Sequence, residues 1–133
     1  MRNKGKLTIA GMALSLLFAT TAFAATATFS GTLPSNQGDT EISTVSRANE
    51  WNVVQYFSIK ITSLGSGYSS VRAWTENSTG INLSSPYTEV TLNNQATVSY
   101  DSYPAKGLNV TLNLDNPVYT SSSVSVGGNW SPN

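Results

Sequence analysis

Cysteine and histidine are both absent from this chain of 133 residues. Without cysteine, no disulfide can cross-link the fold and no lipid can be attached through a mature amino-terminal cysteine. Without histidine, Ser-His-Asp and Cys-His sites lack their general base, and zinc and copper lose their usual ligands. We therefore expect no catalytic residues, no metal ligands and no cofactor. We also expect stability to be nearly constant between about pH 5.5 and 7, because no unperturbed side chain titrates there.

Charged residues are sparse, at 11% of the chain. After position 24, four basic residues remain against seven acids, which gives a formal net charge of −3. Nucleic acids and anionic lipids attract clustered lysine and arginine, so we expect neither as a partner. The acids, among them Asp39, Glu41 and Asp115, occupy predicted turns or strand positions that solvent would accept. We interpret them as solvated side chains rather than as a calcium loop or an acid pair for glycoside hydrolysis.

The amino terminus has the pattern of a secretory signal peptide. Arg2, Lys4 and Lys6 precede an apolar run that ends at Phe18, and small residues lead to Ala24. The run is shorter than the roughly 18 residues that span a bilayer, which disfavours a retained anchor. We predict a signal peptide over residues 1–24, one domain over residues 25–133, and a secreted, extracellular product without an integral membrane anchor.

Beyond position 24, apolar residues recur at every second position rather than with a helical period. The stretch from Trp51 to Ile61 carries large apolar side chains on one parity, and residues 108–114 alternate leucine and valine with polar residues. Such alternation is typical of a half-buried strand, since successive side chains point to opposite faces of a sheet. We predict central strands over residues 53–61 and 108–114.

Turn-forming residues separate several further apolar stretches. They predict an edge strand over residues 25–33 and strands over residues 41–47, 71–76, 87–92, 95–100 and 123–130. Asn93-Asn94 tolerates the positive φ of a type I′ turn, so we predict that residues 87–92 and 95–100 pair as a hairpin. About eight short strands at this spacing favour an all-β antiparallel sandwich, with a small β-barrel as the alternative.

Serine, threonine and asparagine account for 44 of the 109 residues after position 24, and all three tryptophans and six tyrosines lie in that part of the chain. Aromatic rings that stack on apolar sugar faces, beside amides and hydroxyls, are what a glycan-binding surface needs. The candidate binding residues are Trp74, Trp130, Tyr68 and Tyr103. The alternative is that the tryptophans belong to the core and compensate for a shortage of leucine and isoleucine.

Near its carboxyl end the chain has Gly128-Asn129-Trp130-Ser131-Pro132, followed by Asn133. This ending, together with the signal peptide and the single β domain, resembles small exported proteins of Gram-positive bacteria. The resemblance assigns no catalytic residues. The sequence favours a secreted, non-catalytic protein that recognises cell-envelope glycan or a neighbouring cell surface. A bacteriocin-like, interbacterial antimicrobial protein and an exported structural or matrix protein are the alternatives.

Overall fold

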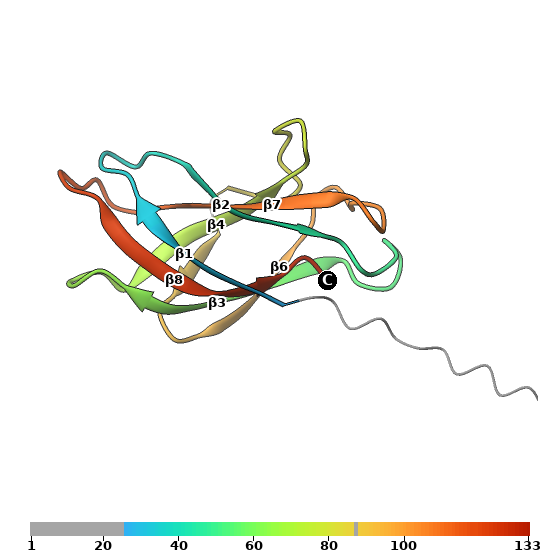
Figure 1. Ribbon diagram of the computed structural model, residues 1–133, viewed down its shortest axis with the longest axis horizontal. Coiled ribbons are helices and arrows are strands. Elements are labelled where there is room, and N and C mark those ends of the chain that lie inside the picture. Colours follow the sequence, from blue (N-terminus) through green and yellow to red (C-terminus); the bar gives the residue numbers. More distant parts are fainter. Residues whose placement is uncertain (1–25, 87) are drawn as a thin grey trace, which may run out of the picture.

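The computed structural model describes residues 26–86 and 88–133, and the predicted signal peptide lies outside them. The described chain is all β, with eight strands in two antiparallel sheets (Figure 1). The strands are β1 (Ala27–Leu33), β2 (Thr40–Ser46), β3 (Tyr56–Leu64), β4 (Ser70–Glu76), β5 (Glu89–Thr91), β6 (Gln95–Ser99), β7 (Asn109–Asp115) and β8 (Val124–Ser131).

One sheet has the order β1-β8-β3-β6 and the other has the order β2-β7-β4-β5. The two sheets face each other as a sandwich and do not close into a barrel, so the preferred fold prediction is confirmed. β3 and β7 occupy inner positions of their sheets, and β1 lies at an edge, as the alternation patterns indicated.

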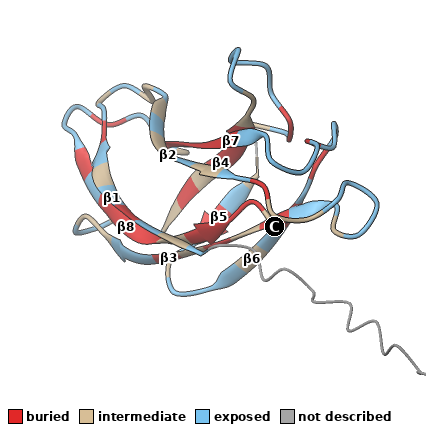
Figure 2. Ribbon diagram, turned by 45° about the vertical axis from the view of Figure 1, so that its right-hand side comes forward, coloured by how far each residue is buried: buried red, intermediate tan, exposed pale blue. Residues whose placement is uncertain are grey.

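The core fills the space between the sheets (Figure 2). Phe57, Ile59 and Ile61 of β3 are fully buried on one parity, in the same cluster as Leu112 and Leu114 of β7. Their outward-facing neighbours along each strand are polar or intermediate in burial, which is the arrangement that a two-sheet sandwich requires. The division of these strands into a core face and an outer face therefore follows directly from the period of two in the sequence.

The hairpin predicted for residues 87–92 and 95–100 does not form. β5 pairs with β4 in one sheet, whereas β6 pairs with β3 in the other. Asn93 does have a positive φ of 66°, but its N–H donates to the carbonyl oxygen of Ile61 at 2.8 Å and turns the chain from one sheet to the other. A tight asparagine turn is compatible with both connections, and the burial of neighbouring side chains between the sheets favours the crossing.

The central strand begins later than predicted. β3 starts at Tyr56, and the preceding residues form a turn in which the Val53 N–H donates to the Glu50 carbonyl oxygen at 3.1 Å. Trp51 and Val53 share the parity of the core residues, yet they are 53% and 66% exposed. The alternation therefore continues past the end of the strand into a loop that projects from the sandwich.

Replacing Phe57 with alanine should lower the free energy of unfolding by about 3–5 kcal/mol, because it leaves a cavity between the sheets. The Phe57 ring contacts those of Tyr100 and Trp130, with centroid distances of 6.0 and 6.4 Å. Urea unfolding followed by fluorescence measures the change, and exposed Thr97→Ala on the neighbouring strand is the control. A loss below about 1 kcal/mol for Phe57→Ala would contradict its place in the core.

Candidate functional site

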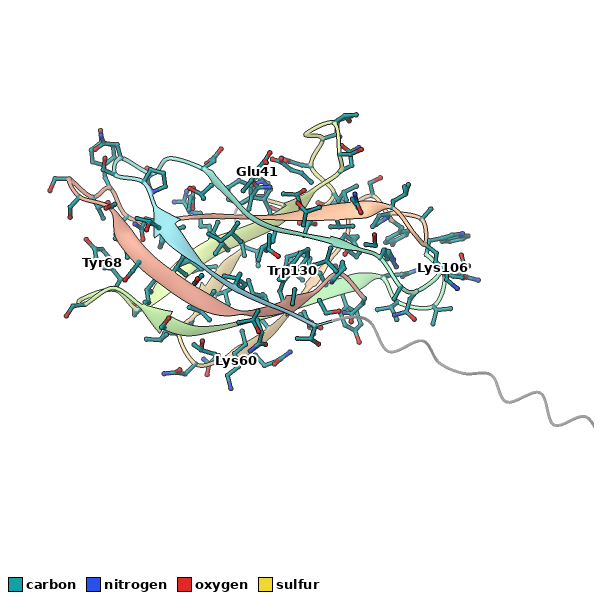
Figure 3. The ribbon with its side chains drawn as sticks, in the orientation of Figure 1. Glu41, Lys60, Tyr68, Lys106 and Trp130 are labelled. Carbon is teal, nitrogen blue, oxygen red and sulfur yellow. The ribbon has the colours of Figure 1, made fainter. Side chains whose placement is uncertain are left out.

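The four binding residues predicted from the sequence do not form one surface. Trp130 and Trp74 are 1% and 3% exposed, Tyr68 is half-buried against the core, and Tyr103 is 44% exposed. Figure 3 shows Tyr68 at the opposite end of the sandwich from Lys106, which lies three residues after Tyr103. Only Tyr103 therefore presents a large part of its ring to solvent.

Trp130 lies between the sheets (Figure 3), as the core alternative proposed. Its indole N–H donates to the Ser43 hydroxyl at 2.9 Å, across from β8 to β2, and its ring meets Phe57 edge to face. The neighbouring Gly128 has no room for a side chain, since a Cβ there would overlap the Lys60 carbonyl oxygen. The Gly-x-Trp part of the carboxyl-terminal motif thus serves packing.

Trp74 lies on the outer face of the sheet rather than in the core. It belongs to the outward-facing parity of β4, with Arg72 and Glu76, and pairs across to Asn113 of β7. Its indole N–H donates to Glu76 Oε1 at 3.1 Å. The chain from Asn82 onward runs along the edge of β4, where the Leu83 N–H donates to the Thr75 carbonyl oxygen at 2.7 Å.

A cavity of about 280 Å³, here called the outer-face cavity, opens beside Trp74. Its walls come from Asp39, Arg72, Trp74, Glu76, Asn82, Pro86 and Asp115. The loop from Asn77 to Asn82 rises above this sheet (Figure 1). The cavity is therefore a hollow on the sheet face, bounded by two loops and lined by charged groups beside one indole.

A second candidate surface, separate from the cavity, carries an exposed aromatic pair that was not predicted from the sequence. The rings of Trp51 and Tyr103, here called the ring pair, are nearly parallel, with an interplanar angle of 14° and centroids 6.4 Å apart. They come from the loops before β3 and before β7, which lie together at one end of the sandwich (Figure 1). The neighbouring residues could have placed Trp51 in a turn, because Asn49, Glu50 and Asn52 are more typical of a turn than of a central strand.

Arg47 joins the two loops that carry the ring pair. Its backbone N–H donates to the Leu108 carbonyl oxygen at 2.9 Å, and its carbonyl oxygen accepts from the Gly107 N–H at 2.8 Å. Its guanidinium Nε donates to the Asn49 carbonyl oxygen at 3.1 Å, and Nη2 donates to the Val54 carbonyl oxygen. One side chain thus binds both ends of the turn that projects Trp51.

The Arg47 side chain is 1% exposed and faces the ring of Tyr100, whose centroid is 5.0 Å from the guanidinium carbon. Burial lowers the pKa of Arg47 and raises the pKa of Tyr100 above its ordinary value, so the tyrosine stays neutral. The Tyr100 hydroxyl donates to the Pro132 carbonyl oxygen at 2.7 Å. A neutral ring face and two backbone carbonyl oxygens contact this charge, and the nearby charge of Glu50 partly offsets the effect of burial on the pKa of Arg47.

Asp115 argues against the expectation of constant stability near neutral pH. Burial raises its pKa from 3.8 to about 6, Arg72 opposes the rise, and the charge of Asp39 adds to it. Asp115 Oδ2 lies 3.7 Å from Arg72 Nη1, whereas Oδ1 is buried without a hydrogen-bond partner. A titrating carboxylate is therefore present in the outer-face cavity despite the absence of histidine.

Comparison with protein-family models, with curated proteins and with solved structures finds no match to this chain. Within residues 26–86 and 88–133, no three cysteine, histidine or carboxylate side chains are grouped so that they could hold a metal ion. The same residues contain no helix with the length and apolar character needed to cross a membrane.

Replacing Arg47 with lysine should loosen the Trp51 loop, because an ammonium cannot bind the Asn49 and Val54 carbonyl oxygens in the planar geometry of a guanidinium. We expect a loss of about 2–4 kcal/mol in the free energy of unfolding. Amide hydrogen exchange should accelerate in residues 48–55 and stay nearly unchanged in residues 103–108, which the Arg47 backbone binds. Arg72→Lys on the sheet face is the matched control. Unchanged exchange in residues 48–55 of Arg47→Lys would mean that the guanidinium bonds do not hold the Trp51 loop.

Because the pKa of Asp115 is higher in the folded state than in the unfolded chain, the folded state binds the proton more tightly. This contribution to stability is complete below about pH 3.8 and is lost as pH rises through about 6. The stability difference between the wild type and Asp115→Asn should therefore change by on the order of 1–2 kcal/mol between pH 4 and 7. Urea unfolding at four pH values measures it, and parallel pH profiles would contradict the raised pKa.

Proposed function

We propose that the chain is a released, non-catalytic protein that recognises a glycan of the cell envelope through the ring pair. The observation that carries this proposal is the exposure of two nearly parallel rings, Trp51 at 53% and Tyr103 at 44%, on adjacent loops. The contact of apolar ring surface with water is unfavourable, and the two rings together form a larger apolar surface than either ring alone.

Sugar rings have apolar C–H faces, and an aromatic ring covers such a face while polar neighbours bind the hydroxyl groups. Asn52 is exposed beside Trp51, and Asp101 and Ser102 are exposed immediately before Tyr103. Together they offer amide, carboxylate and hydroxyl groups next to the rings. These are the groups that distinguish a sugar-binding surface from a purely apolar protein interface.

The anchoring of both loops supports a preformed surface. Arg47 binds the Trp51 loop through its guanidinium and the Tyr103 loop through its backbone. Pro104 is buried directly after Tyr103 and limits the freedom of the backbone there. A surface that is ordered before binding loses less conformational entropy on contact with the ligand, which suits a weak, repetitive target such as a polysaccharide.

The proposal is tested by binding of the purified protein to peptidoglycan and to insoluble polysaccharides. Trp51→Ala and Tyr103→Ala should each weaken binding by about tenfold, which corresponds to roughly 1.4 kcal/mol of lost ring contact. Trp51→Phe and Tyr103→Phe should retain most of it. Tyr119→Ala is the matched control, because Tyr119 is 73% exposed in a loop at the opposite end of β7.

Three outcomes separate the candidate functions. Loss of binding in the two ring-pair variants, with the Tyr119 variant unchanged and all folds intact, supports glycan recognition. Growth inhibition of related bacteria without polysaccharide binding would replace the proposal with the bacteriocin-like function. Neither binding nor inhibition would overturn recognition and leave an exported structural or matrix protein.

A further inference from the structure

We infer that the outer-face cavity is a second binding site, separate from the ring pair, and that it takes a small organic ligand with a protonated primary amine. The juxtaposition that carries the inference is three carboxylates and one guanidinium around a hollow with an indole wall. The ligand class includes amino sugars and short polyamines. The site lies on the sheet β2-β7-β4-β5, whereas the ring pair lies on the loops at one end of the sandwich.

The register between β4 and β7 determines which side chains lie next to one another at the cavity. Arg72 lies opposite Asp115, and Trp74 lies opposite Asn113. Glu76 lies two residues beyond Trp74 on the same strand face, and Asp39 enters from the segment that precedes β2. Asp39 is close enough for its charge to act on Asp115. Acids therefore lie toward both ends of the cavity, with the indole between them.

The charge balance favours a cation. Three carboxylates, from Asp39, Glu76 and Asp115, face one guanidinium, from Arg72, so the fully ionised cavity carries two negative charges. Arg72 is already engaged, since its Nη2 donates to the Pro117 carbonyl oxygen at 3.1 Å and its Nη1 lies near Asp115. An anionic ligand would meet repulsion, whereas an ammonium group would restore the missing positive charge.

The hydrogen-bonding capacity of the cavity also favours a cationic ligand. Asp115 is 7% exposed and its Oδ1 accepts no hydrogen bond, an arrangement that folded proteins rarely leave unsatisfied. Glu76 Oε1 accepts one bond from Trp74. An ammonium has three N–H donors and no acceptor, so it complements a site rich in free oxygen acceptors. Trp74 also lines the cavity, although it is only 3% exposed, so its contribution to binding is a contact at the cavity wall.

The size and geometry of the cavity limit the ligand. At about 280 Å³ the cavity has room for one sugar residue or a short amine, and not for a folded partner. Within the described residues no three potential ligands are grouped to hold a metal ion, so the proposed ligand is an organic cation rather than a metal ion. We therefore use glucosamine as the probe, with glucose and N-acetylglucosamine as uncharged comparisons.

The experiment is a titration of the purified protein followed by the indole N–H resonances in a two-dimensional NMR spectrum. Glucosamine at pH 7 should shift the Trp74 resonance and leave that of the buried Trp130 in place, and glucose should not shift the Trp74 resonance; the Trp51 resonance reports separately on the ring pair. Asp115→Asn should weaken the response at least about tenfold. Glu50→Gln, which removes a carboxylate from the Trp51 turn and not from the cavity wall, is the matched control.

Glu76→Gln provides a second variant with the cavity shape retained, in case Asp115→Asn does not fold. It should weaken glucosamine binding in the same direction, and 0.5 M sodium chloride should weaken binding to the wild type. Equal responses to glucosamine and glucose would overturn the role of charge. A shift confined to Trp51, or no shift at 50 mM glucosamine, would overturn the site while leaving the ring-pair proposal to its own test.

Discussion

A continuous row of contacts runs from the core of the sandwich to the loops at one end, and the exposed ring pair depends on it. Trp130 meets Phe57, Phe57 meets Tyr100, and the Tyr100 ring lies 5.0 Å from the buried guanidinium of Arg47. Taking a guanidinium out of water is costly unless other groups replace its hydration. Here the carbonyl oxygens of Asn49 and Val54 accept from Nε and Nη2 and tie the Trp51 turn to the core, whereas Nη1 is buried without a hydrogen-bond partner.

The arrangement of the sheets was largely predictable because two open faces and two buried faces impose a period of two on the sequence. β3 and β7 could be assigned as inner strands from their aliphatic residues, and β1 as an edge strand from its small ones. The pairing of β5 and β6 could not, since a turn such as Asn93-Asn94 specifies a reversal of the chain and not the sheet that it enters. Strand order depends on contacts between distant residues, which local alternation does not contain.

The candidate surfaces were harder to predict for a related reason. The abundance of aromatic residues does not tell where each ring lies. Parity alone does not distinguish a ring inside the sandwich from one on its outer face or one beyond the end of a strand. Trp130 lies on the inner face of its sheet, whereas Trp74 lies on the outer face of the other sheet. Trp51 continues the parity of β3 at a position before the strand begins. Arg47 was placed at the end of a predicted strand, and nothing in its neighbours indicated that its charge would be buried.

The abundant hydroxyl groups have a structural explanation that leaves the ring pair as the stronger indication of glycan binding. Thr28, Ser30 and Thr32 are exposed on alternate positions of β1, where a sandwich needs polar side chains on its outer face. On the other sheet, Thr44 pairs with Thr111 through their hydroxyls at 2.8 Å. Such groups solvate the sheets or bind one another, and they would be required whatever the protein recognises. Exposed rings are not required by a sandwich, so their retention at the loop end is the feature that folding alone does not explain.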